Sequence, residues 1–176
     1  MRFSVSTASL MHFPLAWVFP VVKAAGFDGV ELAVNWEIAL RGADYVRKLV
    51  ERHGLPVLSV HPPMLPVPGW QDMQTKMIRS VQLAVALDSQ LVTVHPPPAK
   101  TMGDGTAQRY MRGLDACRRE LSNGVALAIE NPAPLRKGQV GRFYAFDDPR
   151  DLRHFAGEQD LPITLDTSHA ALSAIG

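Results

Sequence analysis

Residues 57–63 read Val-Leu-Ser-Val-His-Pro-Pro, and residues 91–97 read Leu-Val-Thr-Val-His-Pro-Pro. Each stretch is a short apolar run rich in Val and Leu, which is typical of a β-strand covered on both faces. Each run ends in His followed by Pro, and the Pro keeps the His extended and stops strand pairing there. Two near-identical strand ends at equivalent positions indicate that a β-strand and helix unit is repeated along the chain.

Four further apolar runs continue this pattern. The six predicted strands are Phe3–Ser6, Gly29–Leu32, Val57–His61, Leu91–His95, Val125–Glu130 and Ile163–Asp166. The amphipathic segments between them predict helices over Leu15–Ala25, Ala43–His53, Gln71–Leu87, Ala107–Leu121 and Pro149–Phe155. Pro20 predicts that the first helix is kinked or starts late. Left-handed residues are predicted to end helices at Gly26, Gly54 and Gly124.

Strands and helices that alternate at roughly 30-residue intervals are typical of βαβ units and of a parallel sheet. Two α/β architectures share this order, a doubly wound open sheet and a (β/α) barrel. No Gly-rich phosphate loop follows any predicted strand, so the nucleotide-binding form of the open sheet gains no support.

The composition narrows the class of protein. Lys and Arg total 18 and Asp and Glu total 17, and such a balance gives no electrostatic footprint for nucleic acid or an anionic membrane. No apolar run reaches transmembrane length, and the polar residues within the first eleven positions argue against a signal peptide. The single cysteine, Cys117, excludes an intrachain disulfide. We therefore expect a cytoplasmic protein in a reducing compartment.

Side chains that can bind metal stand at the ends of the predicted strands. In a parallel barrel all strand carboxyl ends open on one face, which is where active sites of this architecture lie. Imidazole and carboxylate groups suit zinc, manganese and similar divalent ions, and the mixed set does not select one metal. The predicted metal ligands are His61, His95, Glu130, Asp166 and His169.

Glu31, at the end of the second predicted strand, is a less specific candidate. It fits a pocket carboxylate that binds no metal as well as it fits a ligand. The predicted substrate contacts are Glu31, Asn131, His61 and His95. The histidines that do not stand at strand ends are left out of the metal set, and these are His12, His53 and His154.

The strand-end series resembles the xylose-isomerase-like TIM-barrel superfamily over essentially the whole chain. Its most specific piece is Asp166-Thr167-Ser168-His169-Ala170, and the segment from Ala25 to Leu32, Ala-Gly-Phe-Asp-Gly-Val-Glu-Leu, resembles the second-strand unit. The superfamily includes sugar-phosphate isomerases and epimerases and AP-endonuclease-type phosphodiesterases. The resemblance implies that Glu130 and Asp166 are shared metal ligands. It also implies that the three strand-end histidines carry further metals in the endonuclease branch and line the pocket in the isomerase-like branch.

The resemblance also implies a length. Barrels of eight β-α units typically need about 250 residues, and this sequence contains about six units in 176 residues. Residues 1–176 are therefore expected to form a single TIM-type (β/α)-barrel domain that lacks the last two β-α units. In the superfamily those units supply another His ligand and a final Glu.

Three functions remain open. The first is a divalent-metal-dependent (Mn, Zn, Mg or Co) isomerase or epimerase of a small sugar or sugar phosphate. It would act through a metal-stabilised enediolate, with Glu130 as ligand and base. The second is an AP-endonuclease-like multinuclear metal phosphodiesterase, favoured by the three histidines and disfavoured by the lack of positive charge. The third is an inactive or truncated barrel fragment that packs against a partner. A homo-oligomer is compatible with each of them.

Overall fold

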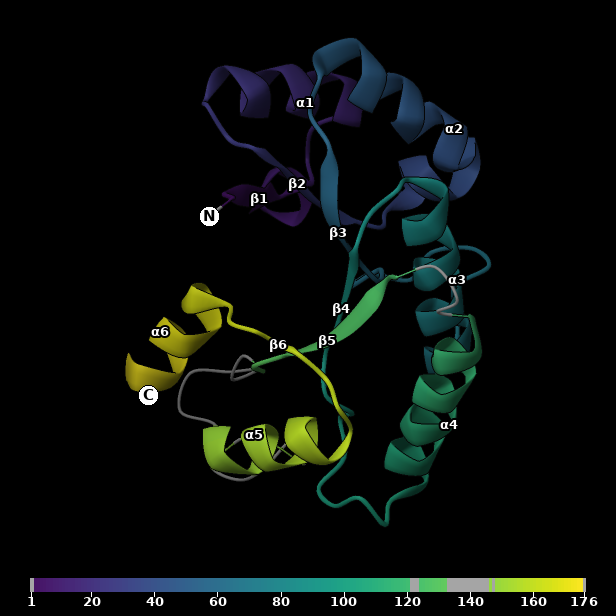
Figure 1. Cartoon of the computed structure of the whole chain (residues 1–176), viewed down its shortest axis with the longest axis vertical. Helices are drawn as coiled ribbons and strands as arrows, with labels where there is room; N and C mark the ends of the chain where they lie inside the picture. Colours follow the sequence, from purple (N-terminus) through teal and green to yellow (C-terminus); the bar gives the residue numbers. More distant parts are fainter. Residues whose placement is uncertain (1, 121–123, 133–145, 147, 176) are drawn as a thin grey trace.

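The computed structural model describes residues 2–120, 124–132, 146 and 148–175. Six parallel strands form one curled sheet in the order β1-β2-β3-β4-β5-β6 (Figure 1). A doubly wound sheet reverses its strand order at a switch point, whereas here every neighbour in the sheet is the next strand in sequence. The sheet is therefore a half-barrel of about six β-α units, and the predicted fold class is confirmed.

All six predicted strands are present; β3 has the predicted bounds, and each of the other five is shifted at one end. Their bounds are β1 Ser4–Ser6, β2 Gly29–Ala33, β3 Val57–His61, β4 Leu91–Val94, β5 Ala126–Glu130 and β6 Ile163–Thr164. The strands β4 and β6 end earlier than predicted, so His95 and Asp166 lie just beyond them. The three glycines predicted to end helices have positive φ angles, which are 84° at Gly26, 56° at Gly54 and 77° at Gly124.

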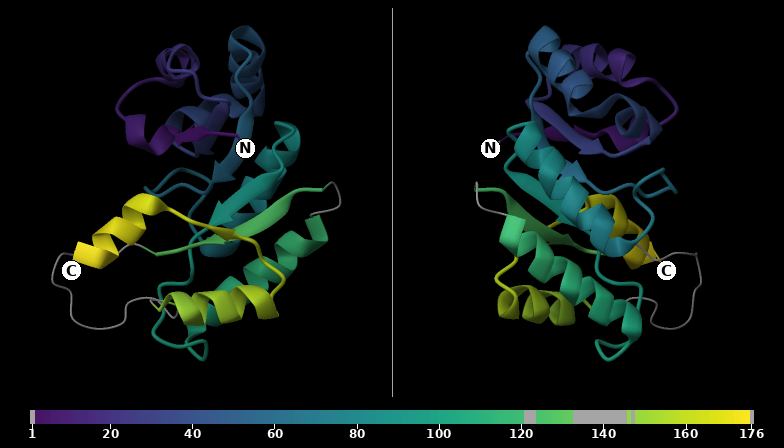
Figure 2. Two further views of the ribbon diagram at one scale, coloured as in Figure 1. Left: turned by 60° about the vertical axis from the view of Figure 1, so that its left-hand side comes forward. Right: turned by 90° about the vertical axis from the view of Figure 1, so that its right-hand side faces the viewer.

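Helices connect the strands and pack against the sheet. Their bounds are η1 Thr7–Leu10, α1 Leu15–Ala24, α2 Trp36–His53, α3 Met73–Ala86, α4 Gly105–Glu120, α5 Pro149–Glu158 and α6 Thr167–Ile175. Neighbouring helices α3 and α4 lie side by side, as do α1 and α2 (Figure 2). Within the part of the chain that the structure describes, no helix combines the length and apolarity needed to cross a bilayer.

Two helices begin earlier than the sequence pattern predicts, α2 at Trp36 and α4 at Gly105. Helix α1 begins at the predicted Leu15 although Pro20 lies inside it, which excludes the late start that Pro20 suggested as one alternative; its first N–H donates to Glu37 Oε2 at 2.9 Å. Helix α2 begins at Trp36, where the Asn35 side chain caps it by accepting from an N–H of the first turn. Gly42, at φ 71° and ψ −176°, separates two helical segments within α2. The apolar periodicity reveals only the segment after this interruption.

The strands β2 and β3 approach each other closely at Gly29. A Cβ at this position would lie 2.5 Å from Leu58 Cγ and 2.7 Å from the Pro56 carbonyl oxygen. That oxygen already accepts from the Val30 N–H at 3.0 Å, so the backbone cannot yield without breaking the strand pair. We expect Gly29→Ala to lower the free energy of unfolding by about 1–3 kcal/mol, measured by urea denaturation followed by circular dichroism.

A second glycine provides the matched control. In helix α5, a Cβ at Gly157 would meet nothing within 4 Å. Gly157→Ala should therefore raise the free energy of unfolding by about 0.5–1 kcal/mol, through its higher helix propensity. Equal stabilities for the two variants would contradict the close strand approach.

Candidate metal centre

The five predicted metal ligands gather at the carboxyl ends of the strands. His61 and Glu130 are the last residues of β3 and β5. His95 follows β4, Asp166 follows β6, and His169 lies in the first turn of α6. The parallel strand direction therefore brings side chains from distant parts of the sequence to one face, as expected for a barrel.

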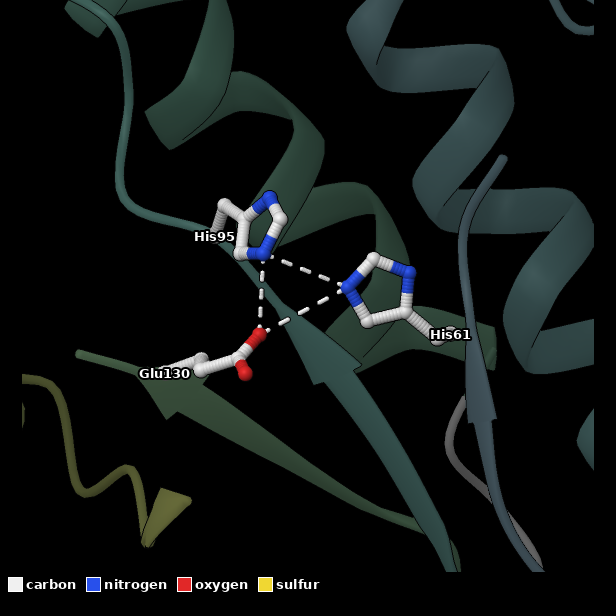
Figure 3. Close-up of side chains that lie close together, drawn as sticks. All are labelled: His61, His95 and Glu130. Atoms are coloured by element: carbon white, nitrogen blue, oxygen red, sulfur yellow. Dashed lines mark hydrogen bonds and ion pairs between the residues drawn. The ribbon is translucent and has the colours of Figure 1, made fainter. Parts of the chain in front are cut away.

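The first cluster consists of two imidazoles around one carboxylate oxygen (Figure 3). Glu130 Oε2 lies 2.9 Å from His95 Nε2 and 3.5 Å from His61 Nε2. The two Nε2 atoms are 3.3 Å apart. The side chains of His61 and Glu130 are only 8% and 7% exposed, so water has little access to the point where the three atoms meet.

A backbone carbonyl fixes the ring of His61. Its Nδ1 lies 2.6 Å from the Pro62 carbonyl oxygen, and because a carbonyl only accepts, Nδ1 must donate. In the neutral ring, Nε2 then presents its lone pair to the cluster. This carbonyl contact is the partner that orients most metal-binding histidines in proteins.

The second cluster shares the same carboxylate. His169 Nδ1 lies 3.7 Å from Glu130 Oε1, and His169 Nε2 lies 3.6 Å from Asp166 Oδ2. One ligand atom from each of Glu130, Asp166 and His169 can be chosen so that all three lie within 4.8 Å of one another. Glu130 is therefore common to both clusters, with Oε2 facing His61 and His95 and Oε1 facing His169 Nδ1.

The short segment after β6 is held by hydrogen bonds of Asp166 and Asn131. Asp166 Oδ1 accepts from the Ser168 N–H, the Ser168 hydroxyl and the His169 N–H at 2.7, 2.6 and 3.0 Å. The Asn131 amide pairs with the Asp166 backbone in both directions, at 3.0 and 2.6 Å. The Asn131 carbonyl also accepts from His169 Nδ1 at 2.9 Å.

Opposing effects set the charge of the first cluster. Burial raises the pKa of Glu130, but the imidazoles of His61 and His95 outweigh it and hold this pKa below its usual range. Burial lowers the pKa of His61, but Glu130 and the charge of Glu31 outweigh it, and the pKa is raised overall. The carboxylate is therefore ionised, as a metal ligand must be.

One carboxylate oxygen of the first cluster has no well-oriented hydrogen bond. Among the described residues, Glu130 Oε2 is buried and receives no well-oriented hydrogen bond, although two imidazole nitrogens lie close to it. Two imidazole nitrogens and a carboxylate oxygen that lie within 3.5 Å of one another are atom types that bind divalent cations. The residues therefore fit a divalent ion, and the donor chemistry does not distinguish Mn, Zn, Mg and Co.

The remaining predicted residues lie beside the ligands. Glu31 lies inside β2 and accepts from the Ser59 hydroxyl at 3.3 Å, and in the described part of the chain it joins neither cluster. The Asn131 amide holds the Asp166 backbone. The substrate contacts predicted for both residues remain predictions.

Sequence reasoning missed the polar residues one layer below the ligands. Ser59, Thr93 and Thr164 each precede a ligand by two positions, and the hydroxyls of the two threonines lie 3.4 Å apart. Because side chains alternate along a strand, the ligand assignments could have revealed this layer.

A family profile described as xylose isomerase-like TIM barrel matches residues 19–174. The chain belongs to the xylose isomerase-like TIM-barrel family. An uncharacterised protein of Mycobacterium leprae is 33% identical to it over 162 residues, which cover 85% of this chain and 52% of that protein. This xylose isomerase-like chain thus spans about half the length of the curated relatives it matches.

Two solved structures illustrate the likeness of fold. A D-tagatose 3-epimerase-like protein has a TM-score of 0.66 at 21% identity, over 97% of this chain and 66% of that chain. A 3-keto-D-glucoside 4-epimerase from E. coli has a TM-score of 0.62 at 15% identity, over 94% and 67%. At these identities the likeness shows the fold alone.

His95 offers a direct test of metal binding, because its side chain is 35% exposed and its truncation leaves the core intact. We expect His95→Ala to weaken Co²⁺ binding at least about 10-fold, since one imidazole donor is lost. Isothermal titration calorimetry measures the effect. The control is His154→Ala, which removes a histidine on the exposed face of α5, and its affinity should equal that of the parent. Equal affinity in all three proteins would rule out the first cluster.

Asn131 tests the positioning of Asp166. Asn131→Asp removes the amide donor to the Asp166 carbonyl and places a second negative charge beside it. Outer hydrogen-bond partners of metal ligands typically account for about 10–100-fold in affinity, and we expect a loss in that range by the same titration. Unchanged affinity, with unchanged circular dichroism, would show that the amide pair does not position the ligand.

Proposed function

We propose that this chain carries the metal centre of a divalent-metal-dependent isomerase or epimerase. The substrate would be a small sugar or sugar phosphate, deprotonated at the carbon next to its carbonyl. The observation that carries the proposal is the Glu130 carboxylate, which is buried, ionised and shared by two clusters of potential ligands. The epimerases of similar fold support the reaction class.

The two oxygens of Glu130 would have different tasks. Oε2 lies between the Nε2 atoms of His61 and His95 and would hold the ion with them. Oε1 faces His169 and would accept the proton of the substrate. A bound divalent cation would supply Lewis-acid stabilisation of the enediolate. Because the pKa of Glu130 is low, the carboxylate is a weak base, and the reaction depends on that activation.

The other residues of the site would bind the metal ion or orient its ligands. His169 and Asp166 would hold the second side of the centre, and the Asn131 amide would keep the Asp166 segment in place. Glu31 would keep negative charge beneath His61 and raise its pKa. The near-zero net charge favours a small-molecule partner over nucleic acid or membrane, and a cytoplasmic location is part of the proposal.

A second candidate function rests on the paired clusters. Two cation sites that share one carboxylate would suit phosphodiester hydrolysis, in which several metal ions activate water and neutralise the phosphate. The lack of net positive charge argues against a DNA substrate. Incubation of the metal-loaded protein with abasic duplex DNA separates the two functions, and strand nicking would favour this alternative.

Deuterium incorporation tests the first proposal. The Mn²⁺-loaded protein is incubated with a panel of ketoses in D₂O, and the products are analysed by proton NMR. We expect solvent deuterium at the carbon next to the carbonyl of at least one sugar, seen as loss of the proton resonance of that carbon. This exchange should stop when the metal is chelated.

Glu130→Gln and Glu158→Gln form the matched pair of variants. Glu130→Gln removes the proposed base and should abolish exchange, whereas Glu158→Gln changes a surface carboxylate that pairs with His154 on α5 and should leave exchange unchanged. Absence of deuterium in every sugar, with metal content verified, would overturn the proposed function.

A further inference from the structure

A small apolar cavity opens on the same face as the metal clusters, next to β3. Its lining includes Thr7, Ala33, Asn35, Trp36, Met64 and Leu65. These residues come from three separate segments, which follow the ends of β1, β2 and β3. The cavity therefore belongs to the mouth of the barrel, where substrates of this architecture bind.

The cavity lies beside the strand end that carries His61. Ala33 lines the cavity and pairs with His61 in the register of β2 and β3, and the Val34 N–H donates to the His61 carbonyl oxygen at 3.0 Å. A substrate that extends from the first cluster past His61 toward β2 would therefore meet this cavity.

The lining offers little to a hydroxyl group. Its two polar side chains already accept hydrogen bonds within the fold, Thr7 Oγ1 from the Ala33 N–H at 2.9 Å and Asn35 Oδ1 from the Ile38 N–H at 3.1 Å. The other lining side chains are apolar. A hydroxyl buried against these mostly apolar side chains would lose its hydrogen bonds to water and regain few of them, which is costly.

Several lining side chains are also left exposed to water. Trp36 and Leu65 are each 55% exposed and Met64 is 51% exposed, so an apolar group in the cavity would cover them. The cavity holds about 50 Å³, and a single water-sized group needs about 10–15 Å³. There is thus room for a methyl or other small alkyl group, and not for a large ring system.

We propose that this cavity is a subsite for an alkyl terminus of the substrate, so that the preferred substrate is a deoxy ketose and not a fully hydroxylated one. The inference rests on the proposed function for the reaction, but it concerns a different part of the site. Hydrophobic pockets distinguish substrates that differ by one small group by about 10–100-fold. That is the preference we expect for a 6-deoxy ketohexose over its parent ketohexose in kcat/KM for deuterium exchange.

Leu65→Asn tests the subsite, because it places a hydrogen-bonding amide in an exposed position of the lining. The preference for the deoxy sugar should fall to about 1–3-fold in this variant. The matched control is Leu40→Asn, since Leu40 is 76% exposed on α2 and is not part of the cavity lining. It should keep the full preference.

Saturation-transfer NMR reads out binding without catalysis. In the Mg²⁺-loaded protein, the terminal methyl of the 6-deoxy ketohexose should receive the strongest saturation, and Leu65→Asn should remove that bias while Leu40→Asn keeps it. Methyl saturation without deuterium exchange would support the subsite while the reaction fails. Exchange without a preference for the deoxy sugar would overturn the subsite and leave the reaction standing. No methyl bias in the unmodified protein would also overturn it.

Discussion

Desolvation of the Glu130 carboxylate is the constraint around which the site is arranged. A buried ionised carboxylate is costly unless charges and hydrogen-bond donors surround it. Here imidazoles from three other parts of the fold lie within 3.7 Å of its two oxygens. Removing that charge would leave the rings of His61 and His95 close together without the carboxylate that lies between them. The buried carboxylate therefore requires neighbours at the strand ends that carry positive charge or donate hydrogen bonds, as imidazoles can.

The fold delivers these side chains without long loops. Each ligand stands at or just after the end of a parallel strand, and strand order follows the chain. The carbonyls of Pro62 and Asn131 then orient two of the rings. The Pro62 carbonyl is adjacent to His61 in the sequence, whereas the Asn131 carbonyl reaches His169 from the end of the neighbouring strand β5. A site built in this way is largely preformed, which favours tight binding of an ion.

Most of the fold, and the gathering of the candidate ligands on one face, could be predicted from the sequence, because both depend on periodic patterns. The repeated His-Pro-Pro strand ends placed His61 and His95 on one face, and the strand preceding Glu130 placed that carboxylate beside them. The amide pairing of Asn131 with Asp166 could not be predicted, since it depends on the spacing of β5 and β6 in space. The interruption at Gly42 was missed because a left-handed glycine leaves no mark in apolar periodicity. The apolar cavity draws on three distant segments, and only the fold brings them together.

We infer that His61, His95 and Glu130 bind one divalent cation together. X-ray absorption spectroscopy of the Co²⁺-loaded protein tests this claim at the metal itself. We expect nitrogen and oxygen atoms directly bound to cobalt, with the more distant scattering of at least two imidazoles, and the loss of one imidazole in His95→Ala. A cobalt spectrum without imidazole scattering, or one unchanged in that variant, would contradict it.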